Sequence, residues 1–250
     1  MTLPSSFLDR PITHRGLHDV TDERPENSLE AIRAAIAAGY GIEIDLQLSH
    51  DGAAMVFHDY HLGRLTTENG PVAQRTSAEL QAITLTGGAT QVPTFAQVLG
   101  EVAGQVPLLI EIKDQDGAMG PNVGALETAT AKALDGYTGD VAVMSFNPHA
   151  VTAFRAAAPN IPVGLVTSAF DPAAWAPLPA RVCERLREIP DFDRSGASFI
   201  SHKAADLTRP RVAEIKATGA AILCWTIKSA AAEAEARKIA DNITFEGYLA

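Results

Sequence analysis

Short apolar runs alternate with longer amphipathic stretches along most of the chain. The short runs are typical of β-strands, and they lie at 11–16, 41–49, 55–59, 107–113, 140–146, 161–167, 197–203, 220–227 and 242–248. The longer stretches favour helices, and they lie at 27–40, 123–137, 148–158, 180–189, 209–219 and 229–240. This alternation predicts βα units that build a parallel sheet.

The number of strands indicates how the sheet is arranged. Setting aside the short run 55–59, eight strands remain, and eight βα units favour a closed (β/α)8 barrel, a TIM barrel of the α/β class. A doubly wound open sheet is the alternative for the same pattern. No helix follows the run 242–248, so we expect the last helix to be absent or replaced by the N-terminal segment.

The regular alternation breaks between His58 and Pro107. Residues 60–106 are too long for one crossover, and they hold Gly and Pro breakers, a helix start at Ser77 and a second short helix over 94–102. We therefore expect residues 1–250 to form one barrel domain with a small insertion after the second strand, lying over one end of the barrel.

The strand 41–49 carries charged residues among its apolar ones. Successive side chains of a strand point to opposite faces. One face would hold Ile42, Ile44, Leu46 and Leu48, and the other Glu43, Asp45 and Gln47. Buried carboxylates are costly unless they are paired or coordinated, so the polar face predicts a functional site. The competing interpretation is the solvated face of an antiparallel sheet.

Polar residues also end several other predicted strands. Active sites of such barrels form at the C-terminal ends of the strands, so these side chains should converge on one rim. The set is His14, Arg15, Glu43, Asp45, His58, Glu111, Lys113 and Trp225. Asp59 follows His58, but we give it little weight because neighbouring strand residues point apart.

The residue types in this set indicate phosphoryl chemistry. Carboxylates supply the oxygen ligands that suit Mg²⁺ or Ca²⁺. Arg15 and Lys113 are able to hold an oxyanion, and His14 and His58 to act as general acid and base near neutral pH. A zinc ion bound by both histidines and a carboxylate is the rival, but it leaves no acid–base pair.

Composition limits the partners of the protein. The net charge of −10 over 250 residues argues against nucleic acid and anionic membranes as partners. We expect no membrane insertion and no signal peptide, because no apolar stretch is long enough and the N-terminus lacks the basic and apolar regions of a leader. Two distant cysteines, Cys183 and Cys224, suit a reducing, cytoplasmic location. The oligomeric state stays open.

The ordered motifs resemble those of glycerophosphodiester phosphodiesterases. HRG and a downstream PEN are followed by E-I-D, D-G and H-D, and then by E-I-K after the insertion and a late W-T. The resemblance covers nearly the whole chain. It implies a TIM barrel with a small insertion, and hydrolysis of a glycerophosphodiester to glycerol 3-phosphate and an alcohol.

The resemblance also implies a role for each matching residue. His14 and His58 match the acid–base pair, without showing which is the acid. Glu43, Asp45 and Glu111 match the metal ligands, and Arg15 and Lys113 match the phosphate-binding cations. Trp225 matches an aromatic residue on the glycerol side. Glu26 and Asn27 match residues that organise the His14 loop. The nucleophile is water or the substrate's own glycerol hydroxyl, which would first give a cyclic phosphate.

The chain departs from the family pattern at its last strand. That pattern often ends in a T-D-x-P turn, whereas this chain reads NITFEGYLA from residue 242, so the contacts of this loop are open. We expect His18 to be a surface loop residue, and His202 is a weaker candidate for the rim.

Two other functions remain as alternatives. A phospholipase D-like enzyme acting on lysophospholipids would need an apolar lip, for which Leu62, Leu65 and Phe95 are candidates, although such residues more often form a small core. A binding protein for glycerophosphodiesters without turnover would not need an acid–base pair.

Overall fold

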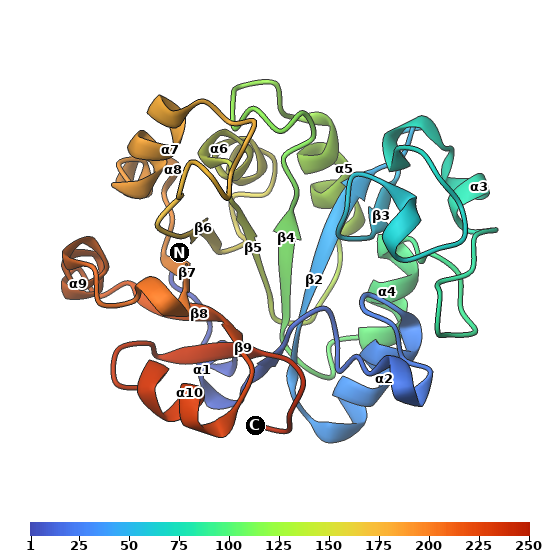
Figure 1. Ribbon diagram of the computed structural model, residues 1–250, viewed down its shortest axis with the longest axis horizontal. Coiled ribbons are helices and arrows are strands. Elements are labelled where there is room, and N and C mark those ends of the chain that lie inside the picture. Colours follow the sequence, from blue (N-terminus) through green and yellow to red (C-terminus); the bar gives the residue numbers. More distant parts are fainter.

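The computed structural model describes residues 1–250 and shows a closed barrel of parallel strands surrounded by helices (Figure 1). The parallel strands are β1 (Ile12–Thr13), β2 (Gly41–Leu48), β4 (Leu108–Ile112), β5 (Val141–Ser145), β6 (Val163–Thr167), β7 (Phe199–Lys203), β8 (Ala221–Ile227) and β9 (Asn242–Phe245). Strand β1 pairs with both β2 and β9, so the sheet has no open end. The predicted (β/α)8 barrel is confirmed, and the open sheet is excluded.

The short run that was set aside is a ninth strand. β3 (Ala54–Val56) runs antiparallel to β2, with Leu46 opposite Val56. It ends before His58, so His58 and Asp59 lie in a loop and the side-chain alternation of a strand does not apply to them.

The helices begin and end at capping residues. The longer ones are α2 (Leu29–Ala38), α4 (Phe95–Val102), α5 (Ala125–Ala133), α6 (Pro148–Ala157), α7 (Ala180–Arg187), α9 (Pro210–Ala217) and α10 (Ala230–Ala236). Single turns form α1 (Ser6–Asp9), α3 (Ser77–Leu80), α8 (Phe192–Ser195), η1 (Val20–Asp22), η2 (Leu62–Arg64), η3 (Val72–Gln74) and η4 (Ala204–Asp206). The Ser28 side chain accepts a hydrogen bond from the Ala31 N–H at the start of α2, and Gly39 ends that helix at a φ of 71°. No helix is both long enough and apolar enough to cross a membrane.

The main core fills the space between the strands and the helices. It comprises 37 buried residues, among them Ile42, Ile44 and Leu46, which face the helices as the alternation predicted. Inside the barrel lies a second cluster, made of Phe7, Ile12, Leu109, Ala142, Met144, Val166, Phe199 and Leu223. The barrel interior is therefore closed by apolar side chains and is not a pore.

The N-terminal segment helps to close the floor of the barrel. Phe7 of α1 is fully buried in the inner cluster. The Asn242 amide donates hydrogen bonds to the carbonyl oxygens of Phe7 at 2.7 Å and Arg10 at 2.6 Å. These bonds tie α1 to β9, where we expected either no helix or a substitute from the N-terminus.

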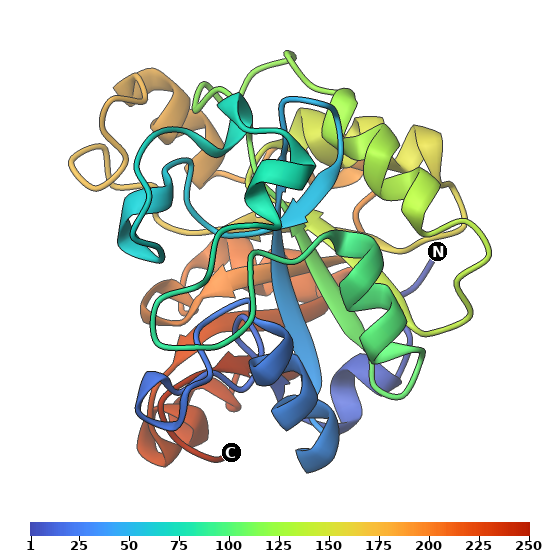
Figure 2. The ribbon, with the colours of Figure 1, turned by 90° about the vertical axis from the view of Figure 1, so that its right-hand side faces the viewer.

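The residues between β3 and β4 divide into two parts (Figure 2). The first has a small core of its own, made of Met55, Phe57, Leu62, Leu65, Val72, Leu80, Leu85 and Val92. The second is α4, whose Phe95 and Val98 belong to the main core and whose Glu101 pairs with Arg33 of α2 at 2.8 Å. The insertion bounds of 60–106 stay a prediction.

Candidate active site

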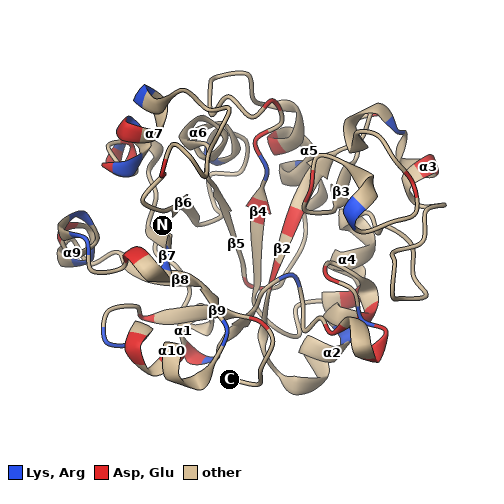
Figure 3. Cartoon of the chain, viewed as in Figure 1, with Lys and Arg blue, Asp and Glu red and all other residues tan.

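Three buried carboxylates lie on neighbouring strands inside the barrel. Glu43 and Asp45 belong to β2, and Glu111 lies beside Asp45 on β4. Their exposed fractions are 2%, 1% and 6%, and ligand atoms from all three lie within 4.8 Å of one another. Figure 3 shows acidic positions, coloured red, on β2 and β4. The solvated antiparallel face is therefore ruled out.

Two cations lie against this carboxylate cluster. Lys113 Nζ is 2.7 Å from both Asp45 Oδ1 and Glu111 Oε1. Arg15 Nε is 3.4 Å from Asp45 Oδ2, and the Arg15 N–H donates to Glu43 Oε2 at 3.0 Å. Arg15 and Lys113, predicted to bind phosphate, thus also pair with the predicted metal ligands.

The three carboxyl groups differ in electrostatic environment. Burial, together with the charges of Asp45 and Glu111, raises the pKa of Glu43. Burial also raises the pKa of Glu111 despite Lys113. At Asp45 burial opposes ionisation too, but Lys113, His58 and Arg15 hold its pKa well below its usual range. The site favours a further positive charge, because three buried carboxylates face only two permanent cations.

Asn27 and Glu26 support the loop that carries Arg15. The Asn27 amide donates to Asp45 Oδ2 at 2.9 Å, and its backbone N–H donates to the Arg15 carbonyl oxygen at 2.9 Å. Arg15 and Asn27 both have positive φ, 57° and 59°, a conformation that costs roughly 1–2 kcal/mol for a residue with a side chain. Glu26 accepts a hydrogen bond from Arg15 Nη1 at 2.7 Å.

His58 is oriented by its neighbour. His58 Nδ1 lies 2.6 Å from Asp59 Oδ1. Our low weight for Asp59 was wrong, because these residues follow β3 and do not alternate as in a strand. Burial opposes ionisation of Asp59, but its bonds with His58 and Arg64 hold its pKa below the usual range.

Arg64 of η2 is a site residue that the sequence did not reveal. Its Nε and Nη2 donate to the two oxygens of Asp59 at 2.6 and 2.9 Å, and its Nη1 and Nη2 donate to those of Glu26 at 2.8 Å each. One guanidinium group therefore joins the carboxylate behind His58 to the one behind Arg15. No motif marks this arginine.

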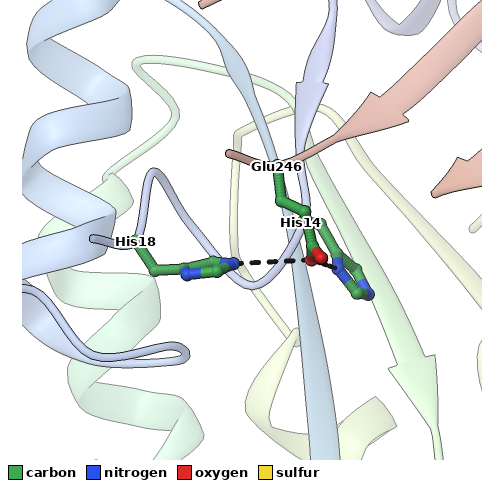
Figure 4. A group of neighbouring side chains, drawn as sticks. All are labelled: His14, His18 and Glu246. Carbon is green, nitrogen blue, oxygen red and sulfur yellow. Dashed lines mark hydrogen bonds and ion pairs between the residues drawn. The ribbon is translucent and has the colours of Figure 1, made fainter. Parts of the chain in front are cut away.

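Glu246, which follows β9, is a second residue that was missed. Its Oε2 is hydrogen-bonded to His14 Nδ1 (Figure 4), and its Oε1 lies 2.6 Å from Lys228 Nζ. The hydrogen bond with His14 holds the pKa of Glu246 well below its usual range. Burial lowers the pKa of His14 even though this bond opposes the shift. The only signal in the sequence was an acidic residue inside the last predicted strand, 242–248.

The two remaining histidine predictions have different outcomes. His18 is half-buried, with Nε2 3.5 Å from Glu246 Oε2, so the expected surface position is wrong. His202 is fully buried, and its Nδ1 is 2.8 Å from Thr167 Oγ1. It does not line the cavities described next.

Seven of the eight side chains predicted to converge on the rim, all except Asp45, border one cavity of about 120 Å³. It is lined by His14, Arg15, Glu43, His58, Glu111, Lys113, Met144, Phe146, Val166, Ser201, Trp225, Thr226 and Thr244. The Trp225 ring packs edge-on against Phe146, and its Nε1 donates to the Ser201 carbonyl oxygen at 2.9 Å. A wider outer cavity of about 470 Å³ shares His58, Glu111, Lys113 and Phe146, and adds Tyr60, Met119 and Trp175 among others.

The match with a known family covers every site residue predicted from the sequence, whereas Glu246 lies beyond it. The model of the glycerophosphoryl diester phosphodiesterase family matches residues 14–242. The chain is 28% identical over 227 residues to YhdW of Bacillus subtilis, a protein provisionally assigned that activity, and the alignment covers 87% of this chain and 86% of YhdW. It is 29% identical to a glycerophosphodiester phosphodiesterase of Caldanaerobacter subterraneus, over 62% of this chain and 65% of that protein.

A solved structure shows the same architecture. A phosphodiesterase of Oleispira antarctica, in complex with the product sn-glycerol-3-phosphate, matches with a TM-score of 0.76 at 25% identity, over 96% of this chain and 94% of that chain. The chain therefore belongs to the glycerophosphoryl diester phosphodiesterase family and is a phosphoric diester hydrolase.

Proposed function

We propose that the cleft hydrolyses a glycerophosphodiester to glycerol 3-phosphate and an alcohol, with a divalent cation as cofactor and His14 and His58 as the acid–base pair. The observation that carries the proposal is the cavity of about 120 Å³ whose wall holds both histidines, both cations and two of the three carboxylates. A phosphodiester there would meet groups for charge neutralisation and for proton transfer together.

The residues present fit a hard divalent cation. Glu43, Asp45 and Glu111 would hold it, and their donor atoms are all oxygens, which suit Mg²⁺ or Ca²⁺ better than zinc. When bound, the cation would neutralise negative charge that builds up on the phosphoryl group. Zinc bound by His14, His58 and a carboxylate would leave the reaction without an acid–base pair, so we favour the hard cation at the carboxylates.

The phosphate would lie against Arg15. Arg15 Nε is buried and has no hydrogen-bond partner, and the residue borders the cavity. Unpaired buried donors are rare in native proteins, and a phosphate oxygen would satisfy this one. Lys113 would add a point charge on the same side.

The two cavities indicate which histidine serves which end of the substrate. Trp225 and His14 line only the inner cavity, whereas His58 lines both cavities. With the glycerol part against Trp225, the leaving alcohol would point to the outer cavity and receive its proton from His58. His14 would take the proton from the nucleophile, water or the glycerol hydroxyl, and its lowered pKa keeps the ring neutral for this purpose.

The outer cavity supports one second candidate. Tyr60, Met119, Phe146 and Trp175 give it apolar and aromatic walls, which would accept the bulky group of a lysophospholipid. The expected lip does not contribute, because Leu62 and Leu65 are buried in the insertion core and Phe95 in the main core. We favour the smaller diesters because the inner cavity alone holds the whole reacting set.

A substrate panel tests both candidates. Glycerophosphodiesters with different alcohols and a lysophospholipid would be compared, with released glycerol 3-phosphate and released alcohol as readouts, with and without chelator. We expect glycerol 3-phosphate from the small diesters in the presence of metal. Turnover of the lysophospholipid alone would favour the second candidate, and equal turnover after exhaustive chelation would contradict the metal-dependent mechanism.

A further inference from the structure

A second group of metal-binding side chains lies beside the carboxylate cluster. It comprises His14 and His18 from the loop after β1 and Glu246 from the loop after β9, and ligand atoms from all three lie within 4.8 Å of one another (Figure 4). Its donor set is two nitrogens and one oxygen, whereas the carboxylate cluster offers only oxygens. The two sites therefore suit different classes of metal ion.

His18 Nε2 is the atom that needs an explanation. It is buried and makes no hydrogen bond, although it points at Glu246 Oε2 from 3.5 Å. Two ligands of a tetrahedral zinc ion, each about 2.0–2.2 Å from the metal, lie roughly 3.3–3.6 Å apart. The separation is thus too long for a good hydrogen bond and suits two ligands of one ion.

The Glu246 carboxylate divides its two oxygens between different partners. Oε1 pairs with Lys228 Nζ at 2.6 Å, while Oε2 faces both histidines. Oε2 is therefore in place for a metal, and Lys228 holds the other oxygen as second-shell partners of ligating carboxylates do.

We propose that His14 Nδ1, His18 Nε2 and Glu246 Oε2 form an inhibitory site for a borderline divalent transition-metal cation such as Zn²⁺. The hydrogen that His14 Nδ1 shares with Glu246 Oε2 is replaced by the cation, and the single ring proton of neutral His14 is then carried on Nε2, so binding changes the tautomer of His14 and releases no proton from this pair. The site is separate from the carboxylate cluster, which keeps its own cation.

Occupation stops turnover because it removes His14 from acid–base chemistry, a consequence that rests on the proposed function. With a metal on Nδ1, His14 Nε2 carries the remaining ring proton and cannot accept one from the nucleophile. The inhibition therefore acts on turnover and not on the cation at the carboxylates.

Binding is tested first, on the full-length protein in saturating Mg²⁺. Zn²⁺ titration calorimetry at neutral pH should show one tight site that the carboxylate cluster, filled with Mg²⁺, does not provide. Co²⁺ as a probe should give visible absorption bands typical of a low-coordinate site. His18→Ala should weaken Zn²⁺ binding by about 100-fold or more, because loss of even an indirect partner costs 10–100-fold. The matched control, His50→Ala, removes an exposed histidine and should bind Zn²⁺ as the wild type does.

Inhibition is tested with the same variants. Zn²⁺ should inhibit the wild type and His50→Ala at the concentration that fills the site. His18→Ala should keep its uninhibited activity and thermal stability, and should need about 100-fold more Zn²⁺ for inhibition. His18→Gln serves as a second variant that keeps a side chain of similar size.

Two results would overturn the inference. One is a wild type that binds no Zn²⁺ once Mg²⁺ is saturating, and the other is His18→Ala and His18→Gln inhibited at the wild-type Zn²⁺ concentration. A third result separates the inference from the proposed function: Zn²⁺ bound in a His18-dependent way without inhibition would contradict the inhibitory role and the catalytic role of His14. A protein that hydrolyses none of the diesters but binds Zn²⁺ through His18 would reject the proposed function and leave the metal site standing.

Discussion

His14 and His58 share one arrangement at the level of single residues. Each has Nδ1 against a carboxylate, Glu246 for His14 and Asp59 for His58, and each borders the inner cavity. A carboxylate on Nδ1 holds the proton there and leaves Nε2 for the substrate. The two carboxylates come from distant parts of the chain, so the two histidines that we propose as acid and base are supported independently.

Alanine substitution of either histidine should lower kcat by about 10²–10⁴ while the affinity for substrate changes little. The wild-type pH profile should be bell-shaped, and each variant should lose one limb. The double variant should be hardly worse than either single variant if the pair acts as a unit. Near-wild-type kcat in either variant would remove that histidine from the mechanism.

Arg15→Lys should lower kcat/KM at least about tenfold, equivalent to about 1.4 kcal/mol. The substitution replaces the planar guanidinium group with a point charge. It also removes Arg15 Nε, the donor that has no hydrogen-bond partner in the protein. The control is Arg33→Lys, which removes a similar fork on the outer helices, where Arg33 holds Glu101. If the two variants behave alike, Arg15 does not orient the phosphate.

At the scale of elements, the segment after β3 acts on the site through η2. Arg64 holds both Glu26 and Asp59, so this turn connects the Arg15 loop with the His58 loop. The core of eight residues beneath it keeps the turn in place. The turn η2 therefore supports the site without contacting the reacting atoms itself.

Arg64→Ala should lower kcat by about 10-fold, because a misoriented acid–base residue loses part of its contribution of about 10²–10⁴. The affinity for the divalent cation should change little, since Arg64 contacts none of the predicted metal ligands. The control is Arg75→Ala in the same segment, which removes the pair with Glu68 at 3.8 Å. This pair lies outside the network that joins Glu26 and Asp59, so kcat should not change. Loss of metal affinity instead of turnover would contradict this role.

His202 of β7 should affect stability and not catalysis. Burial lowers the pKa of His202, so the unfolded chain binds a proton more readily than the folded one. The stability that His202 contributes is therefore complete above the unfolded value of about 6.5 and is lost as the pH falls through the folded pKa. The slope is at most about 1.4 kcal/mol per pH unit for one proton.

His202→Phe should flatten the dependence of the unfolding free energy on pH below about 6.5, measured by urea unfolding at several pH values. Some slope should remain, because burial lowers the pKa of His14 in the same direction. The control His50→Phe changes an exposed histidine and should keep the wild-type dependence of the unfolding free energy on pH. An unchanged slope in His202→Phe would show that His202 does not titrate on unfolding.

At the scale of the whole molecule, the closed barrel holds its apolar residues at one end of the interior and its charged residues at the other. On the inward side of β4, Leu109 belongs to the apolar cluster inside the barrel, and Glu111, two residues later, lies at the rim. Apolar side chains thus fill one end of the interior, and the charged groups are gathered at the other. The carboxylates are held together by a rigid sheet that does not relax to separate them.

Removal of the cation should therefore affect both activity and stability. Exhaustive chelation should abolish turnover, and Glu111→Gln should reduce metal affinity at least about tenfold.

Glu43→Gln should also raise the melting temperature of the metal-free protein, because it removes a buried charge that burial and its neighbours disfavour. Full activity after chelation, or a lower melting temperature of metal-free Glu43→Gln, would contradict this account.

The sequence by itself determined the elements and part of the site. Alternation along β2 predicted which face carries Glu43 and Asp45, because successive side chains of a strand point to opposite faces. The same reasoning placed Glu111 on β4 and Lys113 on the same face at its end, and it counted the strands of the barrel. These inferences depend only on neighbours in the chain, so a single sequence is enough for them.

The tertiary structure alone decided the pairs that orient the catalytic groups. His14 and Glu246 are 232 positions apart, and they meet because β1 pairs with β9 when the barrel closes. Arg64 reaches Glu26 over 38 positions because the segment after β3 folds back on the rim. Closure and chain reversal bring distant residues together, and no local period in the sequence records such a distance.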